Sequence, residues 1–183
     1  MAQRSAGECQ DQLSPGHIYN YKHMPHLIGL ISDTHGLVRP QVHTALAGVE
    51  LILHAGDVGG QDILDELRLI APVEAVFGNT DPPGAPDLPQ AIERSFGGIR
   101  VHVSHGHELG RPRPEQVAER YDADVVIYGH THRQVIARFG SRIVINPGAA
   151  GPRRFDLVPS VALLRIDGDH VDAELVPLIA ETA

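Results

Sequence analysis

Residues 27–36, LIGLISDTHG, and residues 51–60, LILHAGDVGG, decide the fold of this chain, because each is a short apolar run that ends abruptly in Gly, Asp or His. Such a run is typical of a strand buried on both faces, and its polar end marks the turn at the strand's carboxyl end. Residues 40–47 and 60–70 have the apolar period of helices. The order strand, helix, strand, helix predicts an α/β first half.

The rest of the chain alternates further apolar runs with turn residues. Residues 73–79 continue the pattern as a third strand, and the proline-rich residues 81–90 form a loop. Strands dominate after that loop. Hairpins are expected at 91–105, 133–148 and 160–178, a short helix at 114–123 and a buried strand at 124–130. An α/β first half joined to a strand-rich second half predicts two packed sheets with helices outside.

The composition indicates one domain with an aliphatic core. The chain has 183 residues and is 42% hydrophobic, which is enough to bury a sizeable core. Aromatic residues make up only 4% and Trp is absent, so Val, Ile, Leu and Ala must fill the interior. Residues 1–25 are polar and without period. We therefore expect an N-terminal extension over 1–25 and a folded domain over 26–183.

The charge excludes two classes of partner. A formal net charge of −8 gives no long-range attraction for nucleic acid or anionic membranes. Recognition of a small phosphate ester must therefore be local, and bound divalent ions would supply the positive charge. The one cysteine, Cys9, has no disulfide partner, and no apolar run reaches signal-peptide or transmembrane length. We expect a cytoplasmic protein, with homo-oligomerisation left open.

Polar clusters follow the predicted strands. Asp33 and His35 end the first strand and form half of a divalent-ion site, although such a pair also serves as hydrogen-bonded loop residues. Asp57 ends the second strand, and its two oxygens could bridge two cations or cap the next helix. His54 is expected to pack or bond near the same strand end.

Three more strand ends complete the pattern. Asn79 offers a neutral oxygen ligand or a turn signal, and the clusters Ser104-His105-Gly106-His107 and Gly129-His130-Thr131-His132 each follow an apolar strand. No single cluster is decisive, but together they place candidate metal ligands at five successive strand ends. The seven candidate ligands are Asp33, His35, Asp57, Asn79, His105, His130 and His132.

These blocks resemble the calcineurin-like metallophosphoesterases, in particular the small bacterial and archaeal phosphodiesterase group. The family pattern D-x-H, G-D, G-N, H and G-H-x-H is matched in order between His26 and Val176, and Asn146-Pro147-Gly148 matches a supporting turn. The resemblance implies a four-layer α/β/β/α sandwich of two mixed sheets flanked by helices. It also implies two divalent ions. Asp33, His35, Asp57 and His132 would hold one ion, and Asp57, Asn79, His105 and His130 the other.

The resemblance also implies the chemistry. The mixed imidazole and oxygen ligands suit manganese first, with Fe, Ni, Co or Zn also compatible. The ion pair would hydrolyse a phosphate ester through a metal-bridging hydroxide. Asp57 would bridge the ions, and Asp81 would orient a ligand histidine or form a turn. His107 would supply a proton or orient the site.

One position departs from the wider family pattern, in which many relatives have a histidine after G-N. Here that residue is Thr80, whose hydroxyl is not acidic enough to protonate a leaving group near neutral pH. Esters with good leaving groups should then react best. The sequence therefore favours a phosphodiesterase over a phosphomonoesterase.

Other classes of protein predict different residues at these positions. A non-catalytic protein-interaction scaffold of this fold, like the retromer subunit that resembles the family, predicts decayed ligands, whereas all seven positions hold competent ones. Metallo-β-lactamase-like sites need H-x-H-x-D-H, but His130-Thr131-His132 continues as Arg133-Gln134-Val135. Amidohydrolase sites open with His-x-His on the first strand, where this chain has Asp33-Thr34-His35. Neither metallohydrolase pattern fits.

Overall fold

The computed structural model describes residues 25–82, 88–153 and 156–179. The predicted N-terminal extension lies almost wholly outside these residues. The described chain forms two five-stranded sheets. Sheet A has the order β10-β9-β1-β2-β3, and sheet B has the order β4-β5-β6-β8-β7. Both sheets are mixed: sheet A is parallel from β1 to β3 and antiparallel from β1 to β10, and sheet B has parallel central strands with an antiparallel strand at each edge.

Sheet A combines the two ends of the chain. Its strands are β1 (His26–Ile31), β2 (Leu51–His54), β3 (Val73–Ala75), β9 (Ser160–Asp167) and β10 (His170–Pro177). The C-terminal hairpin of β9 and β10 adds antiparallel to β1, with Ile28 opposite Leu164. The first half of the chain thus shares its sheet with the last residues of the domain.

Sheet B is built from the middle of the chain. Its strands are β4 (Ala91–Phe96), β5 (Ile99–Ser104), β6 (Val125–Ile127), β7 (Val135–Phe139) and β8 (Arg142–Asn146). The parallel strands β5, β6 and β8 run side by side, with Val103 beside Ile127. Their carboxyl ends therefore lie at one edge of the sheet.

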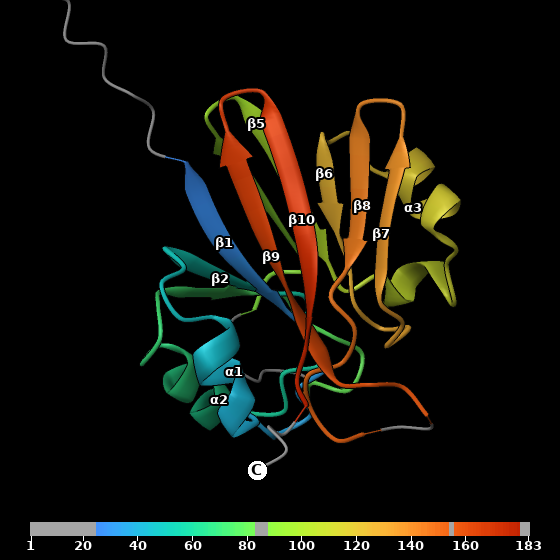
Figure 1. Ribbon diagram of the computed structural model, residues 1–183. Helices are drawn as coiled ribbons and strands as arrows, with labels where there is room; N and C mark the ends of the chain where they lie inside the picture. The colour runs from blue at the N-terminus through green and yellow to red at the C-terminus, as the bar shows by residue number, and fades with distance from the viewer. Residues whose placement is uncertain (1–24, 83–87, 154–155, 180–183) are drawn as a thin grey trace, which may run out of the picture.

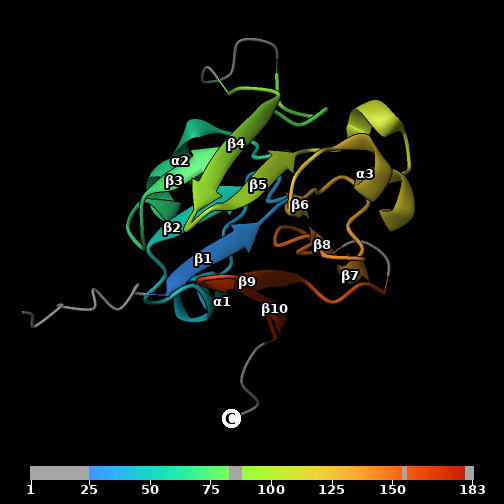
Figure 2. The ribbon, with the colours of Figure 1, turned by 90° about the horizontal axis from the view of Figure 1, so that it is seen from above.

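The apolar side chains form one inner and two outer layers. Leu30 and Leu53 of sheet A pack against Val103 and Ile127 of sheet B in the inner layer. Helices α1 (Pro40–Ala45) and α2 (Gln61–Leu67) cover the outer face of sheet A, and α3 (Pro114–Arg120) covers that of sheet B (Figures 1 and 2). The four-layer sandwich of two mixed sheets flanked by helices is confirmed.

The predicted elements differ from the structure at their ends. The third strand stops at Ala75: the Val76 amide still donates to the His54 carbonyl of β2 at 3.0 Å, but the Phe77 amide donates to the Pro89 carbonyl in the following loop at 2.8 Å. Helix α3 stops at Arg120 because Tyr121 is extended, with ψ of 132°. A short 3₁₀ turn, η1 (His107–Leu109), was not predicted. No helix in residues 25–82, 88–153 or 156–179 is long and apolar enough to cross a membrane.

Candidate metal centre

The candidate site lies where strands from both sheets end. Backbone hydrogen bonds join these ends: the Asp33 amide donates to the Gly56 carbonyl at 3.0 Å, and the Gly129 amide donates to the His105 carbonyl at 3.1 Å. The turns after β1 and β2 are thereby locked to one another, as are those after β5 and β6. Side chains that start from these turns face the same space.

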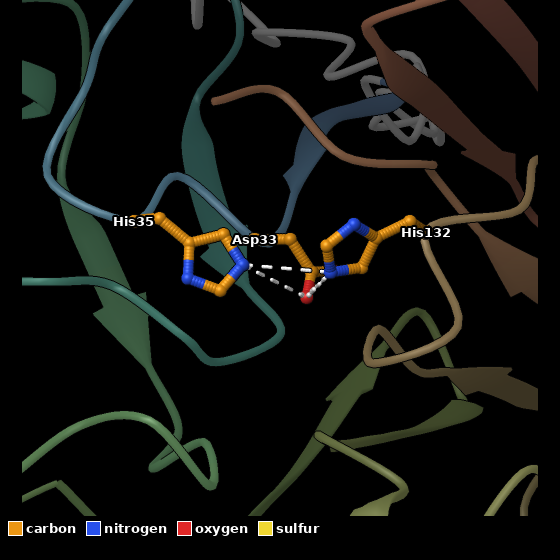
Figure 3. A group of neighbouring side chains, drawn as sticks. All are labelled: Asp33, His35 and His132. Atoms are coloured by element: carbon orange, nitrogen blue, oxygen red, sulfur yellow. Dashed lines mark hydrogen bonds and ion pairs between the residues drawn. The ribbon is translucent and has the colours of Figure 1, made fainter. Parts of the chain in front are cut away.

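The first group of converging side chains is Asp33, His35 and His132, whose ligand atoms all lie within 4.8 Å of one another (Figure 3). His132 Nε2 is 3.1 Å from Asp33 Oδ1 and 3.4 Å from His35 Nε2. Asp33 extends from the end of β1, and His132 reaches it from the loop after β6 on the other sheet. The group therefore spans both sheets.

The second group consists of Asp33, Asp57 and His105, which satisfy the same 4.8 Å criterion. His105 Nε2 is 3.4 Å from Asp57 Oδ2 and 3.2 Å from Asn79 Oδ1. Asp57 Oδ2 is also 3.8 Å from His35 Nε2, so this carboxylate lies between the two groups. His130 belongs to neither group, and the centroid of its ring is 5.2 Å from that of His105.

The side chains fit a divalent cation. Asp33 is fully buried, and within the described residues its Oδ1 has no partner with hydrogen-bond geometry, even though His132 Nε2 is close. A buried carboxylate oxygen without compensation is costly, and a cation would compensate it. Carboxylate, amide and imidazole donors together suit borderline ions such as manganese or zinc. These side chains are therefore suitable ligands for a divalent ion, which would also compensate the buried Asp33 carboxylate.

Backbone strain is concentrated on the candidate ligands. Among the described residues, the non-glycine residues with positive φ are Asp33 (54°), His35 (45°), Asp57 (55°), His130 (63°) and His132 (58°). This left-handed region is unfavourable for residues with a Cβ, by about 1–3 kcal/mol each, and persists only where the surrounding structure imposes it. All five belong to the predicted ligand set. The fold thus holds these side chains in orientations that a relaxed turn would not give.

His105 is oriented by a backbone carbonyl. Its Nδ1 donates to the Ala55 carbonyl at 2.7 Å, and its Nε2 faces Asp57 and Asn79. Burial would lower the pKa of His105, but its hydrogen bond to Asp57 and the charges of Asp33 and Asp57 raise it. The sequence does not indicate that the Ala55 carbonyl orients His105, because every residue has a backbone carbonyl.

Asp57 is held as an anion. Burial would raise the pKa of its carboxyl, but the hydrogen bond and charge of His105 and the hydrogen bonds from Thr80 hold that pKa well below its usual range. The Thr80 amide donates to Asp57 Oδ1 at 2.8 Å, and the Thr80 hydroxyl is 3.4 Å from His35 Nδ1. Thr80 thus supports two candidate ligands.

His54 bonds within its strand end, as expected from the sequence. The Gly56 amide donates to His54 Nδ1 at 3.2 Å, which leaves the hydrogen on Nε2 to donate to the Thr34 hydroxyl at 2.8 Å. The hydroxyl in turn donates to the Val58 carbonyl at 2.8 Å. Complete burial lowers the pKa of His54 to about 4, so the ring is neutral. His54 braces the turn after β1 and is absent from both converging groups.

The two further predicted residues lie in different surroundings. Asp81 accepts the amides of Gly59 and Gly78, each at 2.9 Å, and so ties together the loops after β2 and β3. Such contacts with loop amides fit the alternative in which Asp81 forms a turn, rather than the one in which it orients a ligand histidine. His107 lies at the rim, with its ring centroid 5.4 Å from that of His105 and 6.3 Å from that of His130. It therefore borders the space that the ligands surround.

Ser32 is a supporting residue that sequence reasoning missed. Its hydroxyl lies between Asp33 Oδ2, at 2.6 Å, and the Gly148 carbonyl, at 2.7 Å. Asn146, in the predicted supporting turn, donates to the Gly129 carbonyl at 2.7 Å and accepts the Gly148 amide at 3.0 Å. This network links the loop that carries His132 to Asp33 on the other sheet. The only signal in the sequence is that a small polar residue directly precedes a candidate ligand.

Comparisons with known proteins bear on the family and the fold of the chain. The calcineurin-like phosphoesterase superfamily domain matches residues 27–169. The chain is 42% identical over 161 residues to a probable metallophosphoesterase of Methanothermobacter thermautotrophicus, covering 82% of this chain and 91% of that one. It is 30% identical to a phosphodiesterase of Methanocaldococcus jannaschii, covering 66% and 82%. The crystal structure of Entamoeba histolytica Vps29 complexed with Zn²⁺ has a TM-score of 0.68 at 26% identity, covering 84% and 99%.

Proposed function

This chain belongs to the calcineurin-like phosphoesterase superfamily, and we propose that it is a metal-dependent phosphodiesterase with two divalent ions at the centre described above. One ion would be held by Asp33, His35, Asp57 and His132, and the other by Asp57, Asn79, His105 and His130. The position of Asp57 between the two groups supports its role as the shared ligand. Manganese is the first candidate metal, with Fe, Ni, Co or Zn also compatible.

The observation that carries the proposal is the set of left-handed backbone conformations. Every described non-glycine residue with positive φ is a candidate ligand. Glycine adopts such conformations without steric cost, whereas aspartate and histidine adopt them only in a minority of cases. Histidine and aspartate there indicate that their ligand atoms, rather than the turns, are what the structure maintains.

When bound, divalent ions at such a site activate water and neutralise charge on the phosphoryl group. The protein's own residues supply orientation. Asp57 stays ionised because its pKa is lowered by His105 and Thr80 against the opposing effect of burial, and the Ala55 carbonyl holds the His105 ring by Nδ1, so that Nε2 would offer its lone pair once an ion replaces its proton. The Asp33 carboxylate is fixed by the Ser32 hydroxyl. These groups are in place before substrate binds.

The rim residues set the substrate preference in this proposal. Thr80 and His107 border the site, and both can donate a hydrogen bond to a substrate oxygen. Thr80 cannot protonate a poor leaving group. Diesters with good leaving groups are therefore the proposed substrates, in keeping with the name of the Methanocaldococcus jannaschii relative.

The proposal is tested with chelator-stripped protein reloaded with Mn²⁺, Co²⁺, Ni²⁺ or Zn²⁺ in turn. Bis(p-nitrophenyl) phosphate and p-nitrophenyl phosphate are compared under each metal, and the diester should turn over faster. Asp57→Ala should lose about 10³-fold or more of the diester kcat and bind fewer ions. Asp62→Ala, an exposed carboxylate at the start of α2, is the matched control and should behave as the wild type.

Three outcomes would contradict parts of the proposal. Comparable turnover of monoester and diester would remove the diester preference. Full metal content and hydrolysis in Asp57→Ala would reject the shared-ligand assignment. A protein that binds the ions but hydrolyses neither ester would instead be a metal-binding interaction scaffold of the same fold.

A further inference from the structure

Arginines without a carboxylate partner border the candidate centre. Acidic residues outnumber Lys and Arg by 23 to 15, so an acidic partner is available to most arginines of this chain. Within the described residues, the five arginines on the loops after β1, β5, β6 and β8 have no carboxylate oxygen within 4.0 Å; they are Arg39, Arg111, Arg113, Arg133 and Arg153. Four described arginines outside these loops have one at 2.6–3.4 Å, namely Arg68, Arg94, Arg100 and Arg142.

Arg39 is held beside Asp33 through the backbone. Its Nε donates to the Gly151 carbonyl at 3.1 Å, and the Gly151 amide donates to the Asp33 carbonyl at 3.1 Å. Within the part of the chain that the structure describes, the two Nη atoms of Arg39 have no hydrogen-bond partner, and the side chain is half-buried. A carbonyl carries only a partial negative charge, so the guanidinium remains a net cation. Arg39 therefore places positive charge near a candidate ligand.

Arg153 lies beside a second candidate ligand. Its exposed side chain lines a small cavity together with Pro152 and with His132, the residue that faces Asp33 in Figure 3. The cavity has a volume of about 10 Å³, which holds about one water molecule. It is therefore too small to be the binding site of a substrate, but it shows that Arg153 and His132 are neighbours. Arg39 and Arg153 thus both adjoin residues 151–153, next to the Asp33 and His132 pair.

A phosphate group is the anion that best matches these side chains. A guanidinium binds phosphate through two parallel hydrogen bonds, and such charge-assisted bonds are about twice as strong as neutral ones. In the proposed reaction the two divalent ions would neutralise the scissile phosphoryl group. The guanidinium groups of Arg39 and Arg153 are then available to a different anionic group of the same substrate.

We propose that Arg39 and Arg153 determine specificity by binding a second phosphate group of the substrate, so that the preferred diesters carry one further phosphate near the scissile one. The inference rests on the proposed function, since it assigns the scissile diester to the metal centre. Neither arginine is a metal ligand, and each acts on the binding of substrate. Local positive charge of this kind also allows a chain with a net charge of −8 to bind a substrate with several negative charges.

A matched pair of substrates isolates the second phosphate. Thymidine 5′-(p-nitrophenyl phosphate) and its 3′-phosphorylated form share the scissile bond and the leaving group and differ by one phosphate. Wild-type protein loaded with Mn²⁺ should hydrolyse the 3′-phosphorylated substrate with about tenfold higher kcat/KM, chiefly through a lower KM. Because salt screens exposed charges, this preference should shrink in about 0.5 M NaCl.

The variants remove one guanidinium at a time. Arg39→Gln keeps an amide donor for the Gly151 carbonyl, and Arg153→Gln changes an exposed side chain. Each should lower the ratio of the two kcat/KM values about threefold, and the double variant should bring it close to one. The matched control is Arg165→Gln on β9. Arg165 is exposed, lies opposite Leu27 near the start of β1 and has no carboxylate oxygen within 4.0 Å among the described residues, so its removal should keep the wild-type ratio.

Binding is measured separately, by calorimetric titration of thymidine 5′-monophosphate and thymidine 3′,5′-bisphosphate into the same full-length proteins. The bisphosphate should bind the wild type about tenfold more tightly, and this advantage should fall in Arg39→Gln and Arg153→Gln. A wild type that hydrolyses neither diester but keeps the advantage would count against the proposed function alone. Equal kcat/KM for the two diesters would overturn the inference, as would equal affinities for the two nucleotides where no diester reacts. A double variant with the wild-type preference, or an equal loss in Arg165→Gln, would overturn it as well.

Discussion

The two poles of the sandwich use glycine in opposite ways. At the site pole, where the loops carrying the candidate ligands meet, a Cβ on Gly78 would lie 2.1 Å from the Asp57 amide nitrogen, and one on Gly151 would lie 2.1 Å from the Thr34 carbonyl oxygen. At the hairpin pole, where β4–β5, β7–β8 and β9–β10 turn (top of Figure 1), a Cβ on Gly140 or Gly168 would meet nothing within 4 Å. Gly78 and Gly151 thus provide space, whereas Gly140 and Gly168 provide only a turn conformation.

The contrast follows from what each pole has to do. Each hairpin closes on its own neighbouring strand, so its turn needs only a local left-handed residue. At the site pole, loops from both sheets must pass each other closely enough to bring Asp33 and His132 within 3.1 Å. Close approach of backbones requires residues without a side chain. The site pole should therefore tolerate far less change than the hairpin pole.

The largest effect is expected from Gly78→Ala. Gly78 is not in the left-handed region, and the atoms nearest to the new methyl group would be those of Asp57, with its amide nitrogen 2.1 Å and its Oδ1 2.2 Å away. Neither atom can move without displacing a candidate ligand, and we expect a loss of about 4 kcal/mol in the free energy of unfolding. Urea unfolding of chelator-stripped protein measures the loss. The matched control is Gly140→Ala, and a difference below about 1 kcal/mol between the two would remove the contrast between the poles.

Local patterns in the sequence predicted the strands and the place of the site but not the pairing of the sheets. The apolar runs before Asp33, Asp57 and His105 are buried strands, and their polar ends do converge. That β9 pairs with β1, more than a hundred residues earlier, depends on which sheet edge the hairpin reaches. Periodicity within either segment carries no information about such a partner.

The geometry of the site was also only partly predictable. The order of the candidate ligands indicated which residues meet, but the positive φ of His35 and His132 could not be foreseen, because histidine adopts that region only in a minority of cases and contacts between loops decide which. Asp81 illustrates the same limit, since its partners are amides of Gly59 and Gly78 in two separate loops. Contacts of this kind depend on how loops pass each other in three dimensions.

A pH-dependent effect of about 3 kcal/mol is expected from His54 at the site pole. Its pKa is about 4 in the folded protein, whereas the ordinary histidine value of 6.5 applies to the unfolded chain, so the unfolded chain binds more protons between these values. Stability should therefore fall as the pH drops from 6.5 to 4, by roughly 1.4 kcal/mol per pKa unit. His54→Gln can keep a donor to the Thr34 hydroxyl without titrating.

The measurement is the difference in unfolding free energy between wild type and His54→Gln in chelator, from pH 4 to 8. The difference should be flat above pH 6.5 and change below it. The titration of His105, whose pKa is raised, changes the unfolding free energy above that pH range. The titration of Asp57, whose pKa is lowered, changes it at lower pH. Parallel pH profiles of the two proteins would show that His54 is not held neutral in the fold.

A smaller effect is expected from Ser32→Ala, which removes the hydroxyl between Asp33 and the Gly148 carbonyl. Loss of one buried hydrogen bond should cost about 1–2 kcal/mol in unfolding free energy. Because Asp33 would lose its orienting contact, affinity for Mn²⁺ should also fall about tenfold. Ser141→Ala, at the exposed turn between β7 and β8, is the hairpin-pole control. Equal metal affinities in the two variants would mean that the Ser32 network does not position Asp33.

The smallest effect is expected at the tip of the last hairpin. Gly168 has φ of 57° and no atom near a potential Cβ, so Gly168→Ala should cost only the left-handed conformation, about 1 kcal/mol. Gly168→Asn should cost less, because asparagine adopts that region more readily. Both should bind Mn²⁺ as the wild type does. Chemical denaturation and metal titration check the two expectations together. A loss of several kcal/mol in Gly168→Ala, or a weakened ion in either variant, would mean that the hairpin pole is packed against its surroundings and coupled to the centre. In that case the strained backbone of the candidate ligands at the site pole could not be contrasted with relaxed turns at the hairpin pole.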